Sequence, residues 1–295
     1  MKTLHLDTGR EMRGGQWQAL YLLRELAAAG HDCMLLARPP LLDRARSEGF
    51  DARPLRFRDV VRLSRSVDLI HAHDAHAHAL VAFMPRPFVV SRRVAFPVRA
   101  SVASRWKYSR AARYLAVSKY VRNILIAGGV PAEKIDIVYD GVPVASAQTG
   151  MRSKIVALDS GDPGKGRALI QKAAQRASLE VFFATDLASA LQEAALFVYI
   201  TKSEGLGSGA LLAMAAGVPV LASDVGGLPE IVEDGVTGLL TNNSPEQIAD
   251  NMLRALGDPA ILARLGDNAR KRVQEGFTTK HMMESTLQVY RKVTG

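Results

Sequence analysis

The residues best suited to chemistry lie in a glycine-rich segment, Ser203-Glu204-Gly205-Leu206-Gly207-Ser208-Gly209. It follows an apolar run of strand composition and precedes a helix-forming run, Ala210–Ala216. Alternating glycines can place successive amides around an anion at the positive end of a helix. Glu204 adds a carboxylate that accepts hydrogen bonds from hydroxyl groups. The segment therefore predicts a site for a phosphate joined to a hydroxyl-rich group.

A second glycine pair, Gly14-Gly15, stands near the N-terminus between an expected strand and an expected helix. Glycines at a helix start let the backbone approach a phosphate, and the free N–H groups there favour an anion. The alternative is a tight turn that uses glycine for steric reasons. The segment lacks the G-x-G-x-x-G spacing of dinucleotide-binding loops.

Histidines and arginines follow two further expected strands. His71, His73, His76 and His78 fall within eight residues, a density that raises the possibility of a metal site. Because the first pair would end a strand and the second pair would diverge on a helix, a turn lining the active site is favoured over a metal site. Arg92 and Arg93 follow the next strand, where positive charge suits a phosphate or carboxylate, although a solvated basic helix is the alternative.

Short apolar runs alternate with helical patterns along the whole chain, which is typical of parallel βαβ units. Eleven strands are expected: 2–6, 32–37, 69–72, 88–91, 114–117, 135–138, 154–157, 179–183, 196–199, 218–222 and 238–240. The expected helices span 16–29, 75–84, 101–113, 120–128, 166–176, 187–194, 210–216, 245–256, 259–275 and 279–293. Gly141–Gly150 lacks periodicity and marks a domain boundary. The pattern predicts two doubly wound α/β domains with ligands at the carboxyl ends of strands and an active site in the cleft between them.

The charge of the chain is concentrated in its N-terminal half. Residues 1–150 hold 23 Lys and Arg against 13 Asp and Glu, whereas residues 151–295 hold 15 against 16. Such asymmetry favours an anionic partner for the basic half: nucleic acid, an anionic lipid surface or a phosphorylated substrate. A merely solubilising surface is the alternative. No nucleic-acid module is evident, because basic residues do not interleave with aromatic ones.

Composition restricts the cellular setting. The 295-residue chain is 48% hydrophobic and has one cysteine, Cys33, so neither a disulfide framework nor a cysteine-built zinc site is expected. No signal peptide and no membrane-spanning run is recognised. A cytoplasmic protein is expected, at most peripheral on the inner face of the cytoplasmic membrane.

The motifs together resemble those of GT-B glycosyltransferases of family 4. The resemblance rests on the segment from Ser203 to Val220, on Gly-Gly-Leu-Pro-Glu-Ile-Val at 226–232, and on Asp-Gly-Val-Thr-Gly-Leu-Leu at 234–240. Arg13-Gly14-Gly15, Asp68–His73, Ala116–Ser118 and Ile137–Val142 extend it to the other half. It implies two Rossmann-like domains facing across a cleft. Residues 1–145 with the returning helix 279–295 would bind the acceptor, and residues 151–278 would bind a nucleotide-sugar.

The resemblance also implies roles for single residues. Lys165, the Gly14-Gly15 loop and the segment Gly205-Leu206-Gly207-Ser208 would hold the donor and stabilise its departing diphosphate, because fixed dipoles aimed at developing charge are a large catalytic term. Glu204 would orient the hydroxyls of the donor sugar. His73 or Arg92 would face the acceptor or the transferred sugar. Neither a metal nor a cofactor is expected.

The sequence departs from the family pattern at three places. Leu212 stands where relatives have a second glutamate that holds the ribose, and no arginine precedes Lys165 in its loop. Only 39 positions separate Lys165 from Glu204, which predicts a C-terminal domain trimmed by about one βαβ unit.

These observations predict a metal-independent, retaining glycosyltransferase. Its acceptor would be a phosphorylated, lipid-linked or lipopolysaccharide-core glycan, and its basic half would contact the membrane. The departures motivate an alternative, a catalytically inactive partner of another glycosyltransferase. A nucleotide-sugar epimerase and a nucleic-acid-binding protein are less favoured alternatives.

Overall fold

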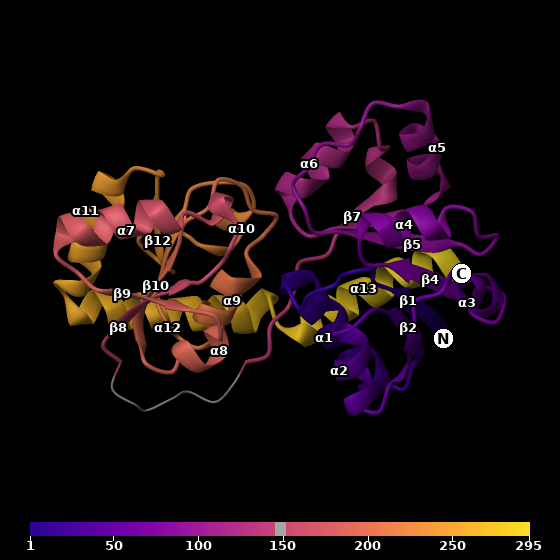
Figure 1. Cartoon of the computed structure of the whole chain (residues 1–295), viewed down its shortest axis with the longest axis horizontal. Coiled ribbons are helices and arrows are strands. Elements are labelled where there is room, and N and C mark those ends of the chain that lie inside the picture. Colours follow the sequence, from indigo (N-terminus) through magenta and orange to yellow (C-terminus); the bar gives the residue numbers. More distant parts are fainter. Residues whose placement is uncertain (145–151) are drawn as a thin grey trace. The chain divides into compact units, whose positions relative to one another are not determined.

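The chain forms two compact units in a computed structural model that describes residues 1–144 and 152–295 (Figure 1). Unit 1 comprises Met1–Gly141 and Thr279–Gly295, and unit 2 comprises Val142–Thr278. The chain thus changes unit at the start of the predicted boundary, Gly141–Gly150, of which residues 145–150 lie outside the described residues.

Unit 1 is built on a parallel sheet of seven strands in the order β3-β2-β1-β4-β5-β6-β7. The strands are β1 (Lys2–Leu6), β2 (Asp32–Ala37), β3 (Asp51–Pro54), β4 (Leu69–Ala72), β5 (Phe88–Arg92), β6 (Arg113–Ala116) and β7 (Ile135–Ile137). The helices are α1 (Gly14–Ala28), α2 (Leu41–Ser47), α3 (Phe57–Ser64), α4 (Ala75–Val81), α5 (Val102–Arg110), α6 (Lys119–Ala127) and α13 (Thr279–Thr294), with a 3₁₀ turn at Ala132–Lys134.

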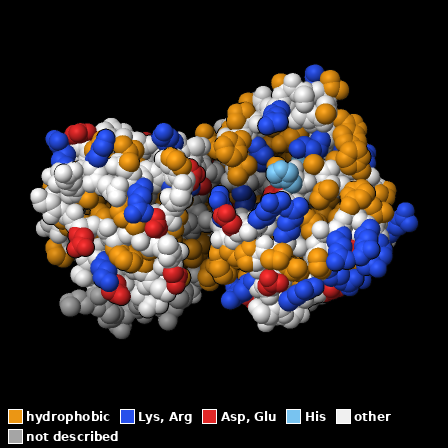
Figure 2. All heavy atoms as spheres, in the orientation of Figure 1, with side chains coloured by type: hydrophobic (Ala, Val, Ile, Leu, Met, Phe, Trp, Pro, Cys, Tyr) orange, Lys and Arg blue, Asp and Glu red, His pale blue; other side chains and the backbone are white. Residues whose placement is uncertain are grey.

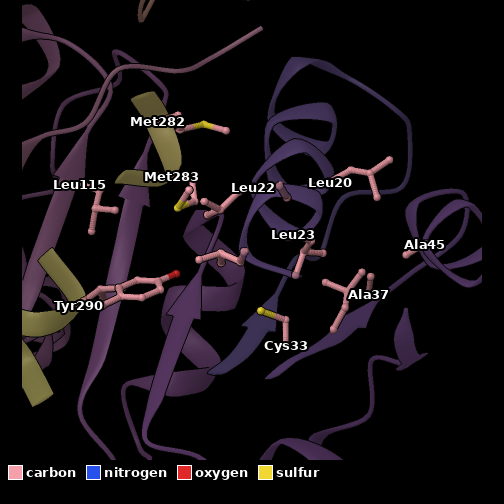
Figure 3. Packing of buried hydrophobic residues seen from close by; sticks show 14 of the residues in the cluster. Leu20, Leu22, Leu23, Cys33, Ala37, Ala45, Leu115, Met282, Met283 and Tyr290 are labelled. Carbon is pink, nitrogen blue, oxygen red and sulfur yellow. The ribbon is translucent and has the colours of Figure 1, made fainter. Parts of the chain in front are cut away.

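The core of unit 1 follows from strands that are covered on both faces. In β2 every residue after Asp32 is buried, as expected for a parallel sheet between two helical layers. On one face, α1 and α13 pack Leu22, Leu23 and Met283 over the sheet (Figure 3). Tyr290 of α13 is fully buried, and its hydroxyl hydrogen-bonds His71 Nδ1 at 2.6 Å. The last helix of the chain therefore completes the core of unit 1.

Unit 2 has a parallel sheet of five strands in the order β12-β11-β10-β8-β9. The strands are β8 (Lys154–Leu158), β9 (Val181–Ala184), β10 (Ala194–Tyr199), β11 (Val220–Ser223) and β12 (Leu239–Thr241). The helices are α7 (Arg167–Ala177), α8 (Leu187–Ala190), α9 (Ser208–Ala215), α10 (Leu228–Ile231), α11 (Pro245–Leu256) and α12 (Pro259–Gly276), with a 3₁₀ turn at Pro163–Lys165. Within the described residues, this sheet lacks an outer strand beyond β9 equivalent to β3 of unit 1, which agrees with the predicted trimming.

The strand order confirms the predicted doubly wound fold. In each unit the order reverses next to the first strand, between β1 and β4 in unit 1 and between β8 and β10 in unit 2. The loops that leave such neighbouring strands run to opposite faces of the sheet and open a crevice at its carboxyl edge. The motif residues Gly14, His73, Lys165 and Glu204 all follow one of these four strands.

Candidate active site

Three polar side chains meet at the crevice of unit 2. Lys165 Nζ lies 2.6 Å from Glu204 Oε2, and Tyr199 Oη donates a hydrogen bond of 2.6 Å to the same oxygen. The amide of Gly205 donates to the other carboxylate oxygen at 3.1 Å. Burial and the neighbouring Glu204 raise the pKa of Tyr199, so its hydroxyl stays protonated and donates. The carboxylate is therefore held in one orientation beside a cation.

The turn that carries Lys165 is fastened to the loop after β10. The carbonyl of Gly164 accepts hydrogen bonds from the amide of Lys202 at 2.9 Å and from Thr201 Oγ1 at 3.3 Å. Gly166 has a φ of +67°, and a Cβ there would lie 2.6 Å from the Ile200 carbonyl oxygen. Only glycine suits this backbone, so the Lys-Gly pair brings the ammonium group to the strand end that precedes Glu204.

The predicted anion loop leads directly into α9. Gly207 is the N-cap of this helix with a φ of +109°, and Ser208 is its first residue. The amides of the first turn have no acceptor within the helix, and they carry its positive dipole end. Gly205, Leu206 and Gly207 are buried, whereas Ser208 and Gly209 of the first helical turn are partly exposed, so a ligand here meets the backbone of that turn. The structure thus joins a helix start, a lysine and a carboxylate.

A second pair of glycines, Gly226 and Gly227, packs against the backbone of the loop at Glu204 and Gly205. A Cβ on Gly226 would lie 2.1 Å from the carbonyl oxygen of Glu204, and one on Gly227 would lie 2.1 Å from that of Gly205. The amide of Gly227 also donates to the Glu204 carbonyl at 3.2 Å. The Gly-Gly-Leu-Pro motif therefore shapes the loop through backbone contact that no larger residue allows.

Sequence reasoning missed Tyr199 of this site and Arg167, a cation two residues after Lys165. Tyr199 belongs to an apolar strand, and only its place as the last strand residue could have indicated it. Arg167 begins α7, pairs with Asp159 at the end of β8, and lies 4.3 Å above the ring of Phe183. It supplies a cation after Lys165 in a loop that has no arginine before it.

The crevice of unit 1 is organised around two aspartates. Asp7, buried at the end of β1, accepts hydrogen bonds from Gln16 Nε2 at 3.0 Å and from the amide of Gly9 at 2.8 Å. Burial raises the pKa of Asp7, and these two hydrogen bonds oppose the shift. Asp74 caps α4 and also accepts from the amide and hydroxyl of Thr8. The loops after β1 and β4 are thereby fixed to each other.

Gly14 and Gly15 are the first two residues of α1 in this arrangement. A Cβ on Gly15 would meet no atom of the described residues within 4 Å. Internal packing therefore does not require glycine at this position, whereas a ligand that approaches the helix start would.

His73 belongs to a buried cluster with His71 and His5. One ring nitrogen of each lies within 4.8 Å of the others, so the three histidines could hold a metal ion. In this structure their nitrogens bond elsewhere: His71 contacts Tyr290 and Ser91, and His5 contacts Thr3. A metal would have to displace these hydrogen bonds, and the expectation of a metal-free enzyme stays a prediction. His5 was missed because it stands alone in an apolar strand.

The cluster contains a directed hydrogen-bond chain. Arg93 Nη1 lies 3.4 Å from His73 Nδ1, and His73 Nε2 lies 2.9 Å from His5 Nδ1. Because a guanidinium can only donate, Nδ1 of His73 accepts and its proton resides on Nε2. Burial lowers the pKa of His5 to about 3 and that of His73 far below its usual value, so both rings are neutral. Arg93 in turn forms a buried ion pair of 2.8 Å with Asp140.

The structure separates the two arginines that follow β5. Arg93 joins His73, whereas Arg92 lies on the side of α5, where its Nη2 bonds the carbonyl of Phe96. Successive strand residues point to opposite faces, which explains the separation. Arg92 is 8% exposed, and within the described residues its Nε has no hydrogen-bond partner. Arg93, and not Arg92, is thus the arginine beside His73, and the role predicted for Arg92 stays a prediction.

The remaining histidines of the predicted group do not join this cluster. His76 is exposed on α4, and His78 is buried against Phe88, Tyr108 and Tyr114. The four histidines of this segment therefore lie in three different environments.

Comparison with protein families identifies the class that this fold and site define. The family model described as "Glycosyl transferases group 1" matches residues 159–272, and the model described as "Glycosyltransferase Family 4" matches residues 12–146. Together they match most of both units. The chain belongs to the GT-B glycosyltransferases of family 4.

Sequence similarity to curated relatives covers part of the chain. A D-inositol 3-phosphate glycosyltransferase of Streptomyces coelicolor is 34% identical over 188 residues, covering 57% of this chain and 41% of the relative. An alpha-maltose-1-phosphate synthase of Mycobacterium tuberculosis is 38% identical over 110 residues, covering 35% of this chain and 28% of the relative. The chain therefore matches less than half the length of these relatives.

Solved structures share the fold over the whole chain. Anabaena Alr3699/HepE in complex with UDP and glucose superposes with a TM-score of 0.84 at 18% identity, covering 99% of both chains. The lipopolysaccharide outer core galactosyltransferase WaaB, in its apo form, gives a TM-score of 0.73 at 13% identity, also covering 99% of both chains. At these identities the likeness concerns the fold.

Proposed function

We propose that the protein is a retaining, metal-independent glycosyltransferase that moves a sugar from a nucleotide-sugar to a glycan acceptor. The observation that carries the proposal is the assembly of Lys165, Glu204 and Tyr199 beside the start of α9. A diphosphate needs a cation and free amides, and a sugar needs an oriented hydrogen-bond acceptor. Unit 2 provides all three at the carboxyl edge of its sheet, where the strand order reverses between β8 and β10.

In this proposal unit 2 binds the donor. The phosphates lie against the first amides of α9 and draw Lys165 toward them, while Glu204 accepts hydrogen bonds from sugar hydroxyls. Tyr199 continues to hold Glu204 when the lysine shifts. As the bond between the sugar and the diphosphate breaks, the added negative charge on the leaving group is stabilised by groups that are already in place.

Unit 1 would bring the acceptor and complete the transfer. An acceptor hydroxyl approaches the sugar from the face that the diphosphate leaves, forms the new glycosidic bond, and passes its proton to a departing phosphate oxygen. The open space beside Gly15 suits a close approach of the donor phosphates. The fixed pair of His73 and Arg93 suits a polar acceptor group, with Arg93 restrained by Asp140.

We infer that the acceptor is anionic, a phosphorylated lipid-linked or lipopolysaccharide-core glycan at the inner face of the cytoplasmic membrane. The positive charge of unit 1 favours such a molecule. The names of the relatives, two of which contain a sugar phosphate or an inositol phosphate and one a lipopolysaccharide outer core, agree with it. None of the described helices combines the length and the apolar composition needed to cross a membrane.

Thermal stability with UDP, GDP, ADP and CMP tests the donor site. A nucleotide at a hundred times its dissociation constant adds about 2.7 kcal/mol to the free energy of unfolding. We expect one nucleotide to stabilise the protein and Lys165→Ala to weaken that effect. Lys172→Ala, which removes an exposed lysine of α7, is the matched control and should leave it unchanged.

The transfer reaction is then assayed with the nucleotide-sugar that corresponds to the stabilising nucleotide. The anomeric configuration of the product, read by NMR, tests retention, and activity in the presence of EDTA tests metal independence. If no nucleotide stabilises the protein, the donor site is not functional, and the inactive partner of another glycosyltransferase becomes the better proposal. Leu212, in place of the family's second glutamate, is the residue that motivates this alternative.

A further inference from the structure

One continuous segment of unit 1 carries a large net positive charge. Residues 75–132 contain ten Lys and Arg and no Asp or Glu, an imbalance equal to the whole excess of residues 1–150. The segment runs from α4 through β5, α5 and β6 to α6 and the loop that follows it. A general solubilising surface would mix both signs, so this segment calls for a specific explanation.

The same segment exposes large apolar side chains. Phe83 is 68% exposed, Phe96 71%, Val102 77%, and Val94 and Trp106 are each 43% exposed. Single exposed apolar residues are ordinary, but a group of them marks an interaction surface. We call these five residues, together with Arg99 and Arg105, the α5 surface.

Helix α5 is the centre of this surface. No residue of α5 is buried, so the helix does not contribute to the core of unit 1. Val102 and Trp106 are four residues apart and therefore lie on one side of the helix. The ring of Trp106 lies 4.9 Å from that of Phe83, beyond the end of α4. Figure 2 shows hydrophobic side chains gathered where Figure 1 places α5.

The helix is nevertheless held in place. Arg110 donates hydrogen bonds to the carbonyls of Ala82 and Met84, and Tyr114 Oη donates to the carbonyl of Tyr108. The apolar side chains are therefore presented on a fixed element.

Three basic residues lie in the same stretch of the chain as the exposed apolar ones. Within the described residues, Arg99, Arg105 and Lys107 form no ion pair. Partial burial lowers the pKa of Lys107, and the neighbouring Arg92 and Arg99 act in the same direction. Arginines without an ion pair, in a segment that also exposes aromatic rings, complement a surface that is negatively charged outside and apolar beneath, which is the composition of an anionic lipid bilayer.

We propose that the α5 surface docks the protein onto anionic lipid bilayers, with Phe83, Phe96 and Trp106 inserted among the lipids and Arg99 and Arg105 bound to their phosphates. The proposal rests on the proposed function for its purpose, which is to bring a lipid-linked acceptor to the enzyme. The docking itself requires no sugar transfer.

A second basic region of unit 1 provides a matched control. Arg53, Arg56, Arg58 and Arg62 line a hollow of about 600 Å³ between β3 and α3. Two of them already pair with aspartates, Arg53 with Asp51 and Arg62 with Asp59. Arg56→Ala/Arg58→Ala therefore removes the same charge as Arg99→Ala/Arg105→Ala, from a surface outside the segment 75–132.

Sedimentation with vesicles tests the proposal. The protein should bind vesicles of phosphatidylcholine mixed with phosphatidylglycerol and not vesicles of phosphatidylcholine alone. Arg99→Ala/Arg105→Ala should weaken binding about thirtyfold, and Phe96→Ala/Trp106→Ala should weaken it at least about tenfold. Equal loss in Arg56→Ala/Arg58→Ala would show that net charge alone drives binding, and would overturn the proposal. So would binding to an acidic protein or a nucleic acid without binding to the vesicles.

Fluorescence tests the insertion. The chain has two tryptophans, so Trp17→Phe leaves Trp106 as the reporter. Its emission should shift to shorter wavelength on the mixed vesicles and be quenched by brominated lipid. Unchanged emission from vesicle-bound protein would overturn the insertion of α5.

Different results would overturn the proposed transferase and the proposed docking surface. Stabilisation by a nucleotide without vesicle binding would leave the transferase and remove the docking surface. Vesicle binding without stabilisation by any nucleotide would leave the surface and remove the transferase. The α5 variants should not change the stabilisation by nucleotide, because the donor loop lies in unit 2.

Discussion

The two units place their polar motifs at the same point of a doubly wound sheet but differ in chemical character. Unit 2 has a glycine-rich loop at a helix start, a lysine and a carboxylate, and it contains no histidine. Unit 1 contains all seven histidines of the chain, the buried pair of Arg93 and Asp140, and the excess of positive charge. One fold thus supports two different sites, the proposed donor site built from backbone amides and the proposed acceptor site built from buried side chains.

Lowering the pH should destabilise unit 1 more than unit 2, and this is the largest difference that we expect between the units. Burial lowers the pKa of His5 and His78 to about 3, below the ordinary 6.5. Between these values the unfolded chain binds protons that the folded unit excludes, so stability is lost as the pH falls below 6.5. At pH 5 the loss is about 2 kcal/mol for each of the two histidines. His71 and His73, whose pKa values are also lowered, act in the same direction.

Urea unfolding followed by tryptophan fluorescence measures this effect, because Trp17 and Trp106 both lie in unit 1. The transition should move to lower urea at pH 5 than at pH 7. The raised pKa of Asp7 acts in the opposite direction, since its protonation favours the folded state. His78→Phe is the matched variant and should remove part of the pH dependence. A tryptophan transition that does not move at pH 5 would contradict the buried neutral histidines.

Arg93→Gln should have the next largest effect. It leaves the buried carboxylate of Asp140 without its cation, which lowers the free energy of unfolding of unit 1 by about 3 kcal/mol. Nucleotide affinity should be unchanged, because the donor loop belongs to unit 2. Calorimetric titration of the folded variant with nucleotide checks this, and a weakened affinity would argue against separate donor and acceptor sites.

Gly227→Ala tests the support of the donor loop. The new methyl group would lie 2.1 Å from the Gly205 carbonyl, so the loop must move, at a cost of about 2 kcal/mol. The stabilising effect of the nucleotide should be lost with it. A variant with full nucleotide binding would show that the loop conformation is not required.

Gly15→Ala should change stability least. The methyl group would meet nothing, and alanine favours the helix by about 0.5–1 kcal/mol, so the protein should be as stable or slightly more stable. The transfer rate should nevertheless fall, because a ligand would need this space. Unchanged turnover would show that Gly15 serves the turn alone. Together with Gly227→Ala, this variant distinguishes a glycine needed for packing from one needed for a ligand.

Most of the fold could be predicted from the sequence, because buried parallel strands appear as apolar runs. The expected strands at 2–6, 32–37 and 69–72 have the observed bounds. The strand β3, Asp51-Ala-Arg-Pro54, was missed because an edge strand keeps polar residues and ends here in proline. The expected helix at 187–194 is too long, since Ala194 begins β10.

The site was predicted less completely, for reasons of geometry. The motifs predicted Lys165 and Glu204, but their contact across 39 positions depends on the turn at Gly164 and Gly166. Arg92 and Arg93 are equivalent in sequence, and only the strand alternation decides which one reaches His73. Tyr199 and His5 became visible only when neighbouring strands brought them to their partners.

Hydrogen exchange with and without the stabilising nucleotide tests the central claim most directly. We expect slower exchange in residues 159–166 and 203–211 of unit 2, with the effect weakened in Lys165→Ala and kept in Lys172→Ala. Protection confined to unit 1, or protection in unit 2 that does not depend on Lys165, would contradict a donor site built from Lys165, Glu204 and the start of α9.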